Sequence, residues 1–221
     1  PGMIAMQCAN PSSKLKRIEQ DVPTPDKGEV LVQVSACGIC RTDLHVIDGE
    51  IDARYPIIPG HEIVGRVAAL GPGVDLFRLG QRVGIPWLGF TCGTCSYCRE
   101  GRENLCDRPQ FTGATRDGGY ATHVVADARY CFSLPEGLSD AEATPLLCAG
   151  FIGWRAYRMA GDGQHIGLYG FGAAAHILAQ VALWQGRTVH AFTRPGDVAG
   201  QAFGRSLGCQ WAGGADEMPP I

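Results

Sequence analysis

Charged and aromatic side chains are scarce in this 221-residue chain, at 19% and 8% of its residues. Neither sign of charge is in excess, because 19 lysines and arginines are set against 22 aspartates and glutamates. Nucleic-acid binding depends on a basic surface, so this balance argues against a nucleic-acid partner. Internal repeats and low-complexity tracts are also missing. With apolar residues at 45%, we expect a globular protein with a buried core.

The sequence also lacks an uninterrupted apolar segment long enough to cross a membrane. Its most apolar stretch, residues 166–184, contains Gly167, Gly170 and Gly172 near one end. That pattern favours a strand, a turn and a helix over a membrane span. The first residues show no signal-peptide cleavage pattern. We therefore expect a cytoplasmic protein without a membrane partner.

Glycine and proline are abundant, with 31 and 14 residues, and they divide the chain into short elements. The first two thirds predict a β-rich, barrel-like or sandwich domain. Its expected strands cover residues 29–35, 62–68, 81–85 and 121–126.

After Ser139, which is placed to cap a helix, predicted helices and strands alternate. They cover helix 152–160, strand 165–169, helix 173–185, strand 188–192, helix 198–207 and a third strand at 210–212. This alternation is typical of βαβ units with a parallel sheet. We therefore expect two domains, 1–150 and 151–221.

Ten cysteines are present, and four of them fall within one short loop. The spacing Cys92-x2-Cys95-x2-Cys98-x7-Cys106 lets four thiolates surround one ion, as closed structural zinc sites require. A ferredoxin-type iron–sulfur run has a shorter final spacing followed by proline, whereas Asp107 follows here. Disulfides are disfavoured in a cytoplasmic protein. We predict a structural zinc site in this loop.

Three further segments hold residues that could bind a metal, although each is a weak signal alone. They are CGICRTDLH (37–45), GHE (60–62) and PLLCAG (145–150). Together with CGTCSYCREGRENLC (92–106) and the GFGAAA turn (170–175), they resemble the zinc-dependent medium-chain alcohol dehydrogenases, in the family's order along nearly the whole chain. The resemblance implies a β-rich GroES-like catalytic domain, followed by part of an α/β Rossmann-type dinucleotide-binding domain.

The resemblance implies a second, catalytic zinc held by Cys40, His61 and Cys148. Two thiolates and one imidazole leave a fourth position for an alcohol or water. Glu62 is implied to lie near this metal, either as a transient ligand or as an acid outside the ligand set. Asp43 either orients the ligand histidine or caps a helix.

By the same resemblance, the zinc lowers the pKa of a bound alcohol, whose hydride passes to a nicotinamide. The Thr42 hydroxyl takes the proton, the cofactor ribose relays it and His45 releases it to solvent. Arg41 is implied to face the cofactor pyrophosphate. From the residues alone, His45 and Arg41 could also be solvated surface side chains.

GFGAAA is a GxGxxA phosphate-binding turn in a strand–turn–helix context. Gly170 makes the turn, Gly172 lets the backbone approach the pyrophosphate, and Ala175 is small enough for helix–strand packing. Thr193 and Arg194 stand at the end of the next predicted strand, where NAD-binding proteins carry an acid. A hydroxyl followed by arginine suits a 2′-phosphate, so we expect NADP in preference to NAD.

Trp87 falls where the family places a wall of the substrate pocket, although it could instead be a core aromatic, and Ile47 is a candidate for another wall. A large indole favours primary alcohols and aldehydes over bulky secondary ones; a sugar alcohol or an amino alcohol is an alternative. The resemblance implies two zinc ions per chain, a small-molecule substrate and a homo-oligomeric full-length form. The competing hypothesis is a non-catalytic, zinc-stabilised binding module or an inactive fragment of such an enzyme.

Overall fold

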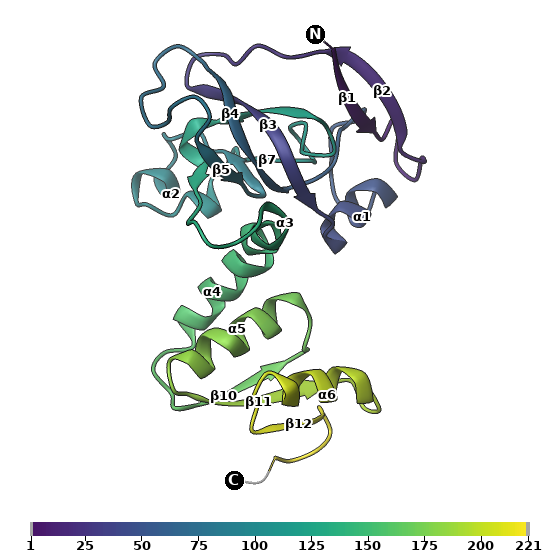
Figure 1. Ribbon diagram of the computed structural model, residues 1–221, viewed down its shortest axis with the longest axis vertical. Coiled ribbons are helices and arrows are strands. Elements are labelled where there is room, and N and C mark those ends of the chain that lie inside the picture. Colours follow the sequence, from purple (N-terminus) through teal and green to yellow (C-terminus); the bar gives the residue numbers. More distant parts are fainter. Residues whose placement is uncertain (1, 220–221) are drawn as a thin grey trace. The chain divides into compact units, whose positions relative to one another are not determined.

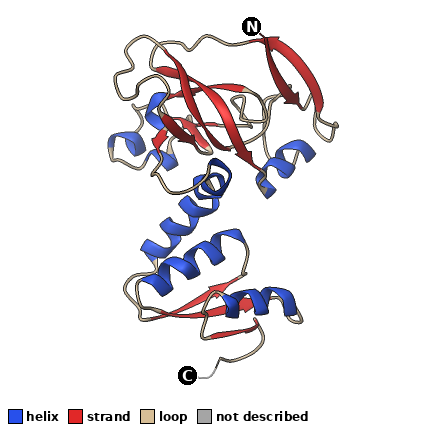
Figure 2. Cartoon of the chain, viewed as in Figure 1, coloured by secondary structure: helices blue, strands red, loops and turns tan. Residues whose placement is uncertain are grey.

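The computed structural model describes residues 2–219 and shows two compact units, Pro1–Cys148 and Ala149–Ile221. Strands and loops dominate the first unit, whereas helices and strands alternate in the second (Figure 1). Figure 2 shows this difference in colour, with the longer helices in the second unit. Among the described residues, no helix is long and apolar enough to span a membrane.

The first unit is built around a five-stranded antiparallel sheet with the order β8-β3-β4-β5-β9. Its strands are β3 (Glu29–Gly38), β4 (Glu62–Leu70), β5 (Arg82–Ile85), β8 (His123–Asp127) and β9 (Phe132–Ser133). The first four confirm the predicted strands, with bounds shifted by a few residues. Val30, Val32, Ile63 and Val83 are fully buried and form the centre of its core.

The pairing of β3 with β4 brings two candidate ligand segments together. Gly38, the last residue of β3, lies opposite Glu62, the first residue of β4. Cys40 follows β3 and His61 precedes β4, so both leave the sheet at the same end. The antiparallel register therefore explains how residues far apart in the sequence become neighbours.

Two two-stranded sheets complete the strands of the first unit. One pairs β1 (Gly2–Gln7) with β2 (Lys16–Asp21), and the other pairs β6 (Leu88–Phe90) with β7 (Gln110–Phe111). The sequence analysis did not predict the first hairpin. Its strand β2 has exposed or half-exposed residues throughout and shows no apolar alternation, which removes the usual signal for a strand.

The helices of the first unit are short. They are α1 (Arg41–Asp48), α2 (Ser96–Arg99) and α3 (Asp140–Ala143), with 3-10 turns η1 (Glu103–Leu105), η2 (Ala128–Tyr130) and η3 (Thr144–Leu147). As predicted, Ser139 caps a helix: its hydroxyl accepts from the amide of Glu142 at 3.2 Å, and the Glu142 carboxylate accepts from the amide of Ser139 at 2.9 Å. The turn η3 then leads directly to Cys148.

The second unit contains a three-stranded parallel sheet with helices between its strands. Its elements are α4 (Ala149–Met159), β10 (His165–Tyr169), α5 (Ala173–Trp184), β11 (Thr188–Thr193), α6 (Val198–Ser206) and β12 (Trp211–Gly214). These confirm the predicted alternation, and α4 begins three residues earlier than expected. Leu178 and Ala182 of α5 pack on Val189 and Ala191 of β11 to form a separate core. The arrangement is the first part of a Rossmann-type fold.

Candidate metal centres and cofactor-binding turn

The four-cysteine loop folds so that its sulfurs face one point. The Sγ atoms of Cys92, Cys95, Cys98 and Cys106 lie within 4.8 Å of one another. Gly93 and Gly101, with φ near +70°, provide the reversals that return the chain to this point.

Backbone amides of the same loop point at these sulfurs. The amides of Thr94 and Cys95 donate to Cys92 Sγ at 3.5 and 3.4 Å, and that of Arg108 donates to Cys106 Sγ at 3.3 Å. The amide hydrogen bonds of Thr94 and Cys95 lower the pKa of Cys92 to about 5. Amides aimed at a thiolate stabilise its charge, so the loop suits a cation held by four sulfurs.

A second group of potential ligands converges elsewhere in the first unit. The ligand atoms of Cys40, His61, Glu62 and Cys148 also lie within 4.8 Å of one another. The sulfurs of Cys40 and Cys148 are 3.8 Å apart, although the residues are 108 positions apart in the sequence. Two thiolates at about 2.3 Å from a tetrahedral zinc would be separated by roughly this distance.

The ring of His61 is oriented for such a site. It is fully buried, and its Nδ1 lies 2.7 Å from the carboxylate of Asp43. The carboxylate accepts a hydrogen bond from the protonated Nδ1, which leaves Nε2 with a lone pair for a metal. Nε2 has no hydrogen-bond partner in the described part of the chain. A buried polar nitrogen facing two sulfurs and lacking a partner fits a metal ion.

Asp43 fills both roles that the sequence left as alternatives. Its Oδ1 accepts from His61 Nδ1 and from the amide of Gly60 at 3.2 Å. Its Oδ2 accepts from the amide of Cys40 at 2.8 Å, which is the capping contact at the start of α1, and from the Tyr120 hydroxyl at 3.1 Å. Burial, and then the charge of Asp43, raise the pKa of Tyr120, so the phenol keeps its proton and donates.

Glu62 is held close to Cys40, His61 and Cys148, which together are called the open ligand set. Its side chain is buried, and this burial raises the pKa of its carboxyl group above the usual value, while the nearby His61 opposes the shift. Gly38 makes room for it, because a Cβ there would lie 2.1 Å from Glu62 Oε2. The glycine therefore allows a carboxylate to approach the Cys40–His61–Cys148 group.

Helix α1 carries the three residues predicted for the proton path and the cofactor. Thr42 is half-buried, and its hydroxyl has no hydrogen-bond partner within residues 2–219. His45 lies three residues later, on the same helix face, and its Nδ1 contacts the carboxylate of Glu50. Arg41, at the helix start, is exposed. The roles of these side chains stay predictions.

Trp87 lies against the candidate ligand histidine. Its ring meets the His61 ring edge-on with centroids 5.1 Å apart, and stacks on Phe111 at 5.0 Å. Ile47 packs in the same apolar cluster. Trp87 is thus both a packed aromatic and a neighbour of the open ligand set, which is compatible with either interpretation of the sequence.

The glycine turn of the second unit has the form expected for phosphate binding. Gly170 has φ +84°, a conformation that favours glycine, and Gly172 caps the start of α5. A Cβ added to either glycine would meet no atom of the chain within 4 Å. Packing within the described chain does not explain Gly172; its position as the helix N-cap and the open space beside it are both compatible with glycine. Ala175 follows in the first turn of α5, as predicted from the motif.

The two residues predicted to select the cofactor lie in different environments. Thr193 is 3% exposed, and its hydroxyl bonds to Arg194 O at 2.9 Å and accepts from Gln201 Nε2 at 3.1 Å. The Arg194 side chain is exposed and has no partner in the described chain. Of the two, Arg194 is the side chain free to meet a ligand.

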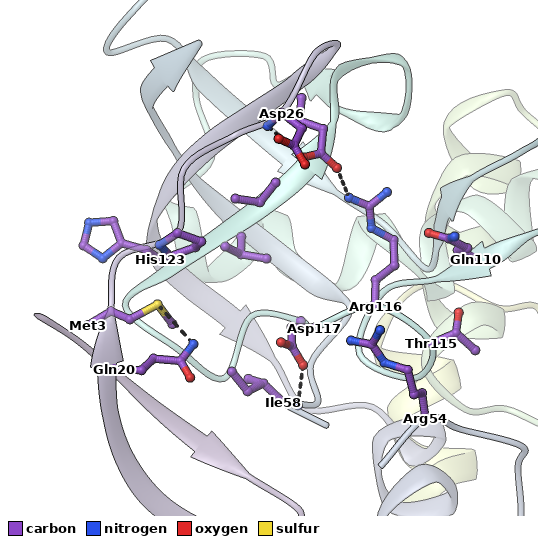
Figure 3. Close-up of a pocket in the computed structure, with 15 residues that line it drawn as sticks. Met3, Gln20, Asp26, Arg54, Ile58, Gln110, Thr115, Arg116, Asp117 and His123 are labelled. Carbon is purple, nitrogen blue, oxygen red and sulfur yellow. Dashed lines mark hydrogen bonds and ion pairs between the residues drawn. The ribbon is translucent and has the colours of Figure 1, made fainter. Parts of the chain in front are cut away.

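A polar cleft of about 480 Å³ on the first unit includes none of the predicted site residues. Figure 3 shows the side chains that line it. Three of its charged side chains are engaged with the chain itself: Arg116 pairs with Glu29 at 2.5 Å, and Asp117 accepts from the amide of Ile58 at 3.0 Å. The cleft wall therefore braces the loop that leads to His61.

The fold and the two ligand groups define a class: a GroES-like β unit followed by the first part of a Rossmann-type unit, as in the medium-chain dehydrogenases. Residues 26–136 match the model of the alcohol dehydrogenase GroES-like domain. The chain belongs to the zinc-containing medium-chain alcohol dehydrogenase family.

Individual relatives support this assignment. A probable alcohol dehydrogenase, AdhA, of Mycobacterium tuberculosis is 46% identical over 215 residues, which are 94% of this chain and 62% of the relative. A cobalt- and zinc-bound thermostable alcohol dehydrogenase from Pyrobaculum aerophilum superposes with TM-score 0.87 at 28% identity, over 98% of this chain and 67% of that one. A structure of CAD from Helicobacter pylori complexed with NADP(H) has TM-score 0.84 at 26% identity, over 96% of this chain and 63% of that one. The chain thus spans about three fifths of the length of these relatives.

Tyr120 and Glu50 are the candidate functional residues that the sequence analysis missed. Residues 117–119, Asp-Gly-Gly, predict a turn from their composition. Two adjacent glycines also signal a close backbone approach, and that signal could have drawn attention to Tyr120. Glu50 follows His45 by five residues without a helical spacing, and nothing in the sequence marks their contact.

Proposed function

We propose that this chain carries the metal-binding part of a zinc-dependent alcohol dehydrogenase or aldehyde reductase that exchanges a hydride between a primary alcohol or aldehyde and NAD(P). The observation that carries the proposal is the convergence of the Cys40 and Cys148 sulfurs with the unpaired Nε2 of His61. Membership of the family supports it. The activity is that of relatives such as AdhA, of whose length this chain spans about three fifths.

Cys40, His61 and Cys148 would hold the catalytic zinc, and the four cysteines between Cys92 and Cys106 would hold a structural one. When bound, the catalytic zinc supplies a Lewis acid that lowers the pKa of a substrate alcohol. Asp43 keeps Nδ1 of His61 engaged, so that Nε2 is free to ligate. Glu62 supplies a carboxylate beside the ligands.

Helix α1 would provide the proton path. Thr42 is two residues beyond Cys40 and has an unengaged hydroxyl, which can accept the substrate proton. His45 is next on that helix face and is part-exposed, so it can release the proton to solvent. The contact between His45 and Glu50 orients the imidazole at this end of the path.

The second unit would bind the dinucleotide. Gly170, Gly172 and Ala175 form the phosphate turn at the start of α5. We assign NADP selectivity to Arg194, since its guanidinium is free, whereas the Thr193 hydroxyl is already bonded within the chain. Arg41 is proposed as a further contact to the pyrophosphate. The NADP(H) complex of the Helicobacter pylori relative supports this cofactor.

Trp87 and Ile47 are proposed as walls of the substrate pocket. The indole lies beside His61 and narrows the space near the open ligand set. A narrow, apolar wall favours primary aliphatic or benzylic alcohols and their aldehydes.

The second candidate function is a non-catalytic, zinc-stabilised module. Its favouring observation is the four-cysteine group, because four sulfurs around one ion leave no position for a substrate. Titration with NADPH separates the two candidates, because a module of this kind would show no saturable cofactor binding.

Metal analysis of three purified forms tests the proposed ligands. The unaltered chain should hold two zinc ions, and Cys40→Ser should hold one. Cys37→Ser is the matched control and should hold two, because Cys37 is close in sequence but outside both ligand groups. In the full-length protein, Cys40→Ser should abolish NADPH oxidation with small aldehydes. A Cys40→Ser form with both zinc ions and unaltered turnover would exclude the proposed centre.

A further inference from the structure

Tyr120 completes the hydrogen bonding of the buried carboxylate that orients His61. An ionised carboxylate offers about four acceptor sites, two on each oxygen. Oδ1 of Asp43 receives the Gly60 amide and His61 Nδ1, and Oδ2 receives the Cys40 amide and the Tyr120 hydroxyl. Asp43 is 1% exposed, so water cannot readily replace a missing donor.

Three of the four donors come from the segments that carry the candidate ligands Cys40 and His61. One is the amide of Cys40, one is the ring of His61, and one is the amide that precedes His61. Tyr120 alone comes from outside these segments. Its hydroxyl therefore ties the carboxylate, and with it two of the three candidate ligands, to a separate part of the first unit.

The ring of Tyr120 is fixed independently of its hydroxyl. The amides of Gly118, Gly119 and Tyr120 donate to Ile58 O at 2.7 Å, Gly60 O at 2.9 Å and Pro59 O at 2.9 Å. Asp117 adds a side-chain contact to the amide of Ile58 (Figure 3). These bonds align residues 117–120 with residues 58–60, the loop just before His61.

The ring itself packs on the open face of Gly60. A Cβ at Gly60 would lie 2.6 Å from Tyr120 Cδ1 and 2.8 Å from Cys37 Sγ. Because the backbone and this packing hold the ring, phenylalanine can occupy the same place. The hydroxyl can thus be removed without removing the side chain that packs there.

We propose that Tyr120 is a positioning residue for the catalytic zinc: its hydroxyl holds Asp43, and Asp43 holds the His61 ring so that Nε2 faces the sulfurs of Cys40 and Cys148. The inference rests on the proposed function. Tyr120 acts through Asp43 and is not itself a candidate ligand. Loss of the hydroxyl leaves Oδ2 with one donor, frees the carboxylate to rotate and weakens the orientation of the imidazole.

Metal affinity of the two centres in the same chain tests this role. Zinc or cobalt(II) is titrated against a competing chelator, and the cobalt absorption bands report the geometry of each centre. Changing a direct partner of a metal ligand commonly reduces affinity by about 10- to 100-fold. Tyr120 lies one contact further out, so Tyr120→Phe should weaken the open centre by roughly tenfold at most and alter its cobalt bands. The four-cysteine centre should keep its affinity.

Tyr157→Phe is the matched control. Its buried ring also donates a phenolic hydrogen bond, to Gln185 at 2.5 Å, but it belongs to the second unit, which contributes no candidate ligand. This form should bind metal at both centres with the same affinity as the unaltered chain. Equal weakening of both centres by Tyr120→Phe would indicate general destabilisation and would overturn the inference, as would unchanged affinity and bands at the open centre.

A double-mutant cycle separates positioning from packing. Asp43→Asn alone should weaken the open centre more than Tyr120→Phe does. Adding Tyr120→Phe to Asp43→Asn should have little further effect, because the charged acceptor is already lost. Fully additive losses would overturn the inference. If the unaltered chain binds metal only at the four cysteines, the proposed function fails as well; if it binds two and Tyr120→Phe changes nothing, only this inference fails.

Discussion

At the residue scale, His61 shows what distinguishes a candidate ligand from a buried polar side chain. A buried nitrogen without a hydrogen-bond partner lowers the stability of the fold by about 1–3 kcal/mol. Both His61 and His190 of β11 have such a nitrogen, Nε2. His61 belongs to a group of potential ligands that includes two sulfurs, whereas neither ligand group of the described chain includes His190. A metal ion would satisfy Nε2 of His61, so the convergence of donors is the informative feature.

Arg194 is the residue to which we assign cofactor selectivity. Arg194→Ala should weaken NADPH binding by roughly tenfold or more, because a charge-assisted bond to phosphate contributes about 1.5–3 kcal/mol. NADH binding should change little, since its ribose carries no 2′-phosphate. Fluorescence titration with both cofactors measures the two affinities.

The control for this prediction is Arg158→Ala, which removes an exposed arginine on α4. It should leave both affinities unchanged. Equal losses of NADPH and NADH affinity in Arg194→Ala would contradict a role in recognising the 2′-phosphate.

At the element scale, the segment 117–120 depends on glycine for its position. A Cβ at Gly118 would lie 2.1 Å from Gly60 O and 2.8 Å from both Gly113 Cα and Pro59 O. All three are backbone atoms, which cannot rotate away as a side chain can. The close approach of these backbone segments therefore sets the position of the loop that precedes His61.

Gly118→Ala should accordingly lower the free energy of unfolding by about 1–3 kcal/mol, the usual range for overpacking. Denaturant unfolding measures the change, and the affinity of the open metal centre should fall in parallel. Gly163→Ala is the control, because its added Cβ would meet only His165 O, at 3.7 Å. Equal stability of the two variants would show that the segment can shift without cost.

The elements differ in how well the sequence predicts them. Strand β10 and helix α5 are marked by an apolar run that ends at Gly170 and resumes as a helix, so their bounds follow the prediction closely. Helix α1 was not predicted, because its eight residues are mostly polar and its cap is the side chain of Cys40 with Asp43. The bracing of residues 58–60 by 117–120 is a tertiary contact that local patterns cannot show.

At the scale of the whole molecule, the two candidate metal centres differ in how their ligands are assembled. The four cysteines come from one loop, so their spacing alone predicts the cluster. Cys40, His61 and Cys148 come from the ends of β3, the start of β4 and the turn η3. Only a resemblance to a known family predicts that second set, since sequence spacing carries no information about such distant contacts.

This difference predicts how the chain responds to removal of metal. A chelator should first release one zinc, from the open centre, because the proposed site would give that ion three protein ligands and an exchangeable fourth position. Release of the second zinc should remove the charge that holds four sulfurs together. Because backbone amides of this loop donate to those sulfurs, their protection against hydrogen exchange should fall at this step.

Hydrogen exchange measured by mass spectrometry localises the effect. Residues 92–106 should lose protection when the second zinc leaves, whereas residues 173–184 of α5 should keep theirs, because the second unit has its own core. An equal loss in both segments would mean that the structural metal supports the whole chain. Unchanged exchange in 92–106 after complete removal of zinc would mean that this loop is held by its own hydrogen bonds and packing, and the assigned structural role of the ion would be wrong.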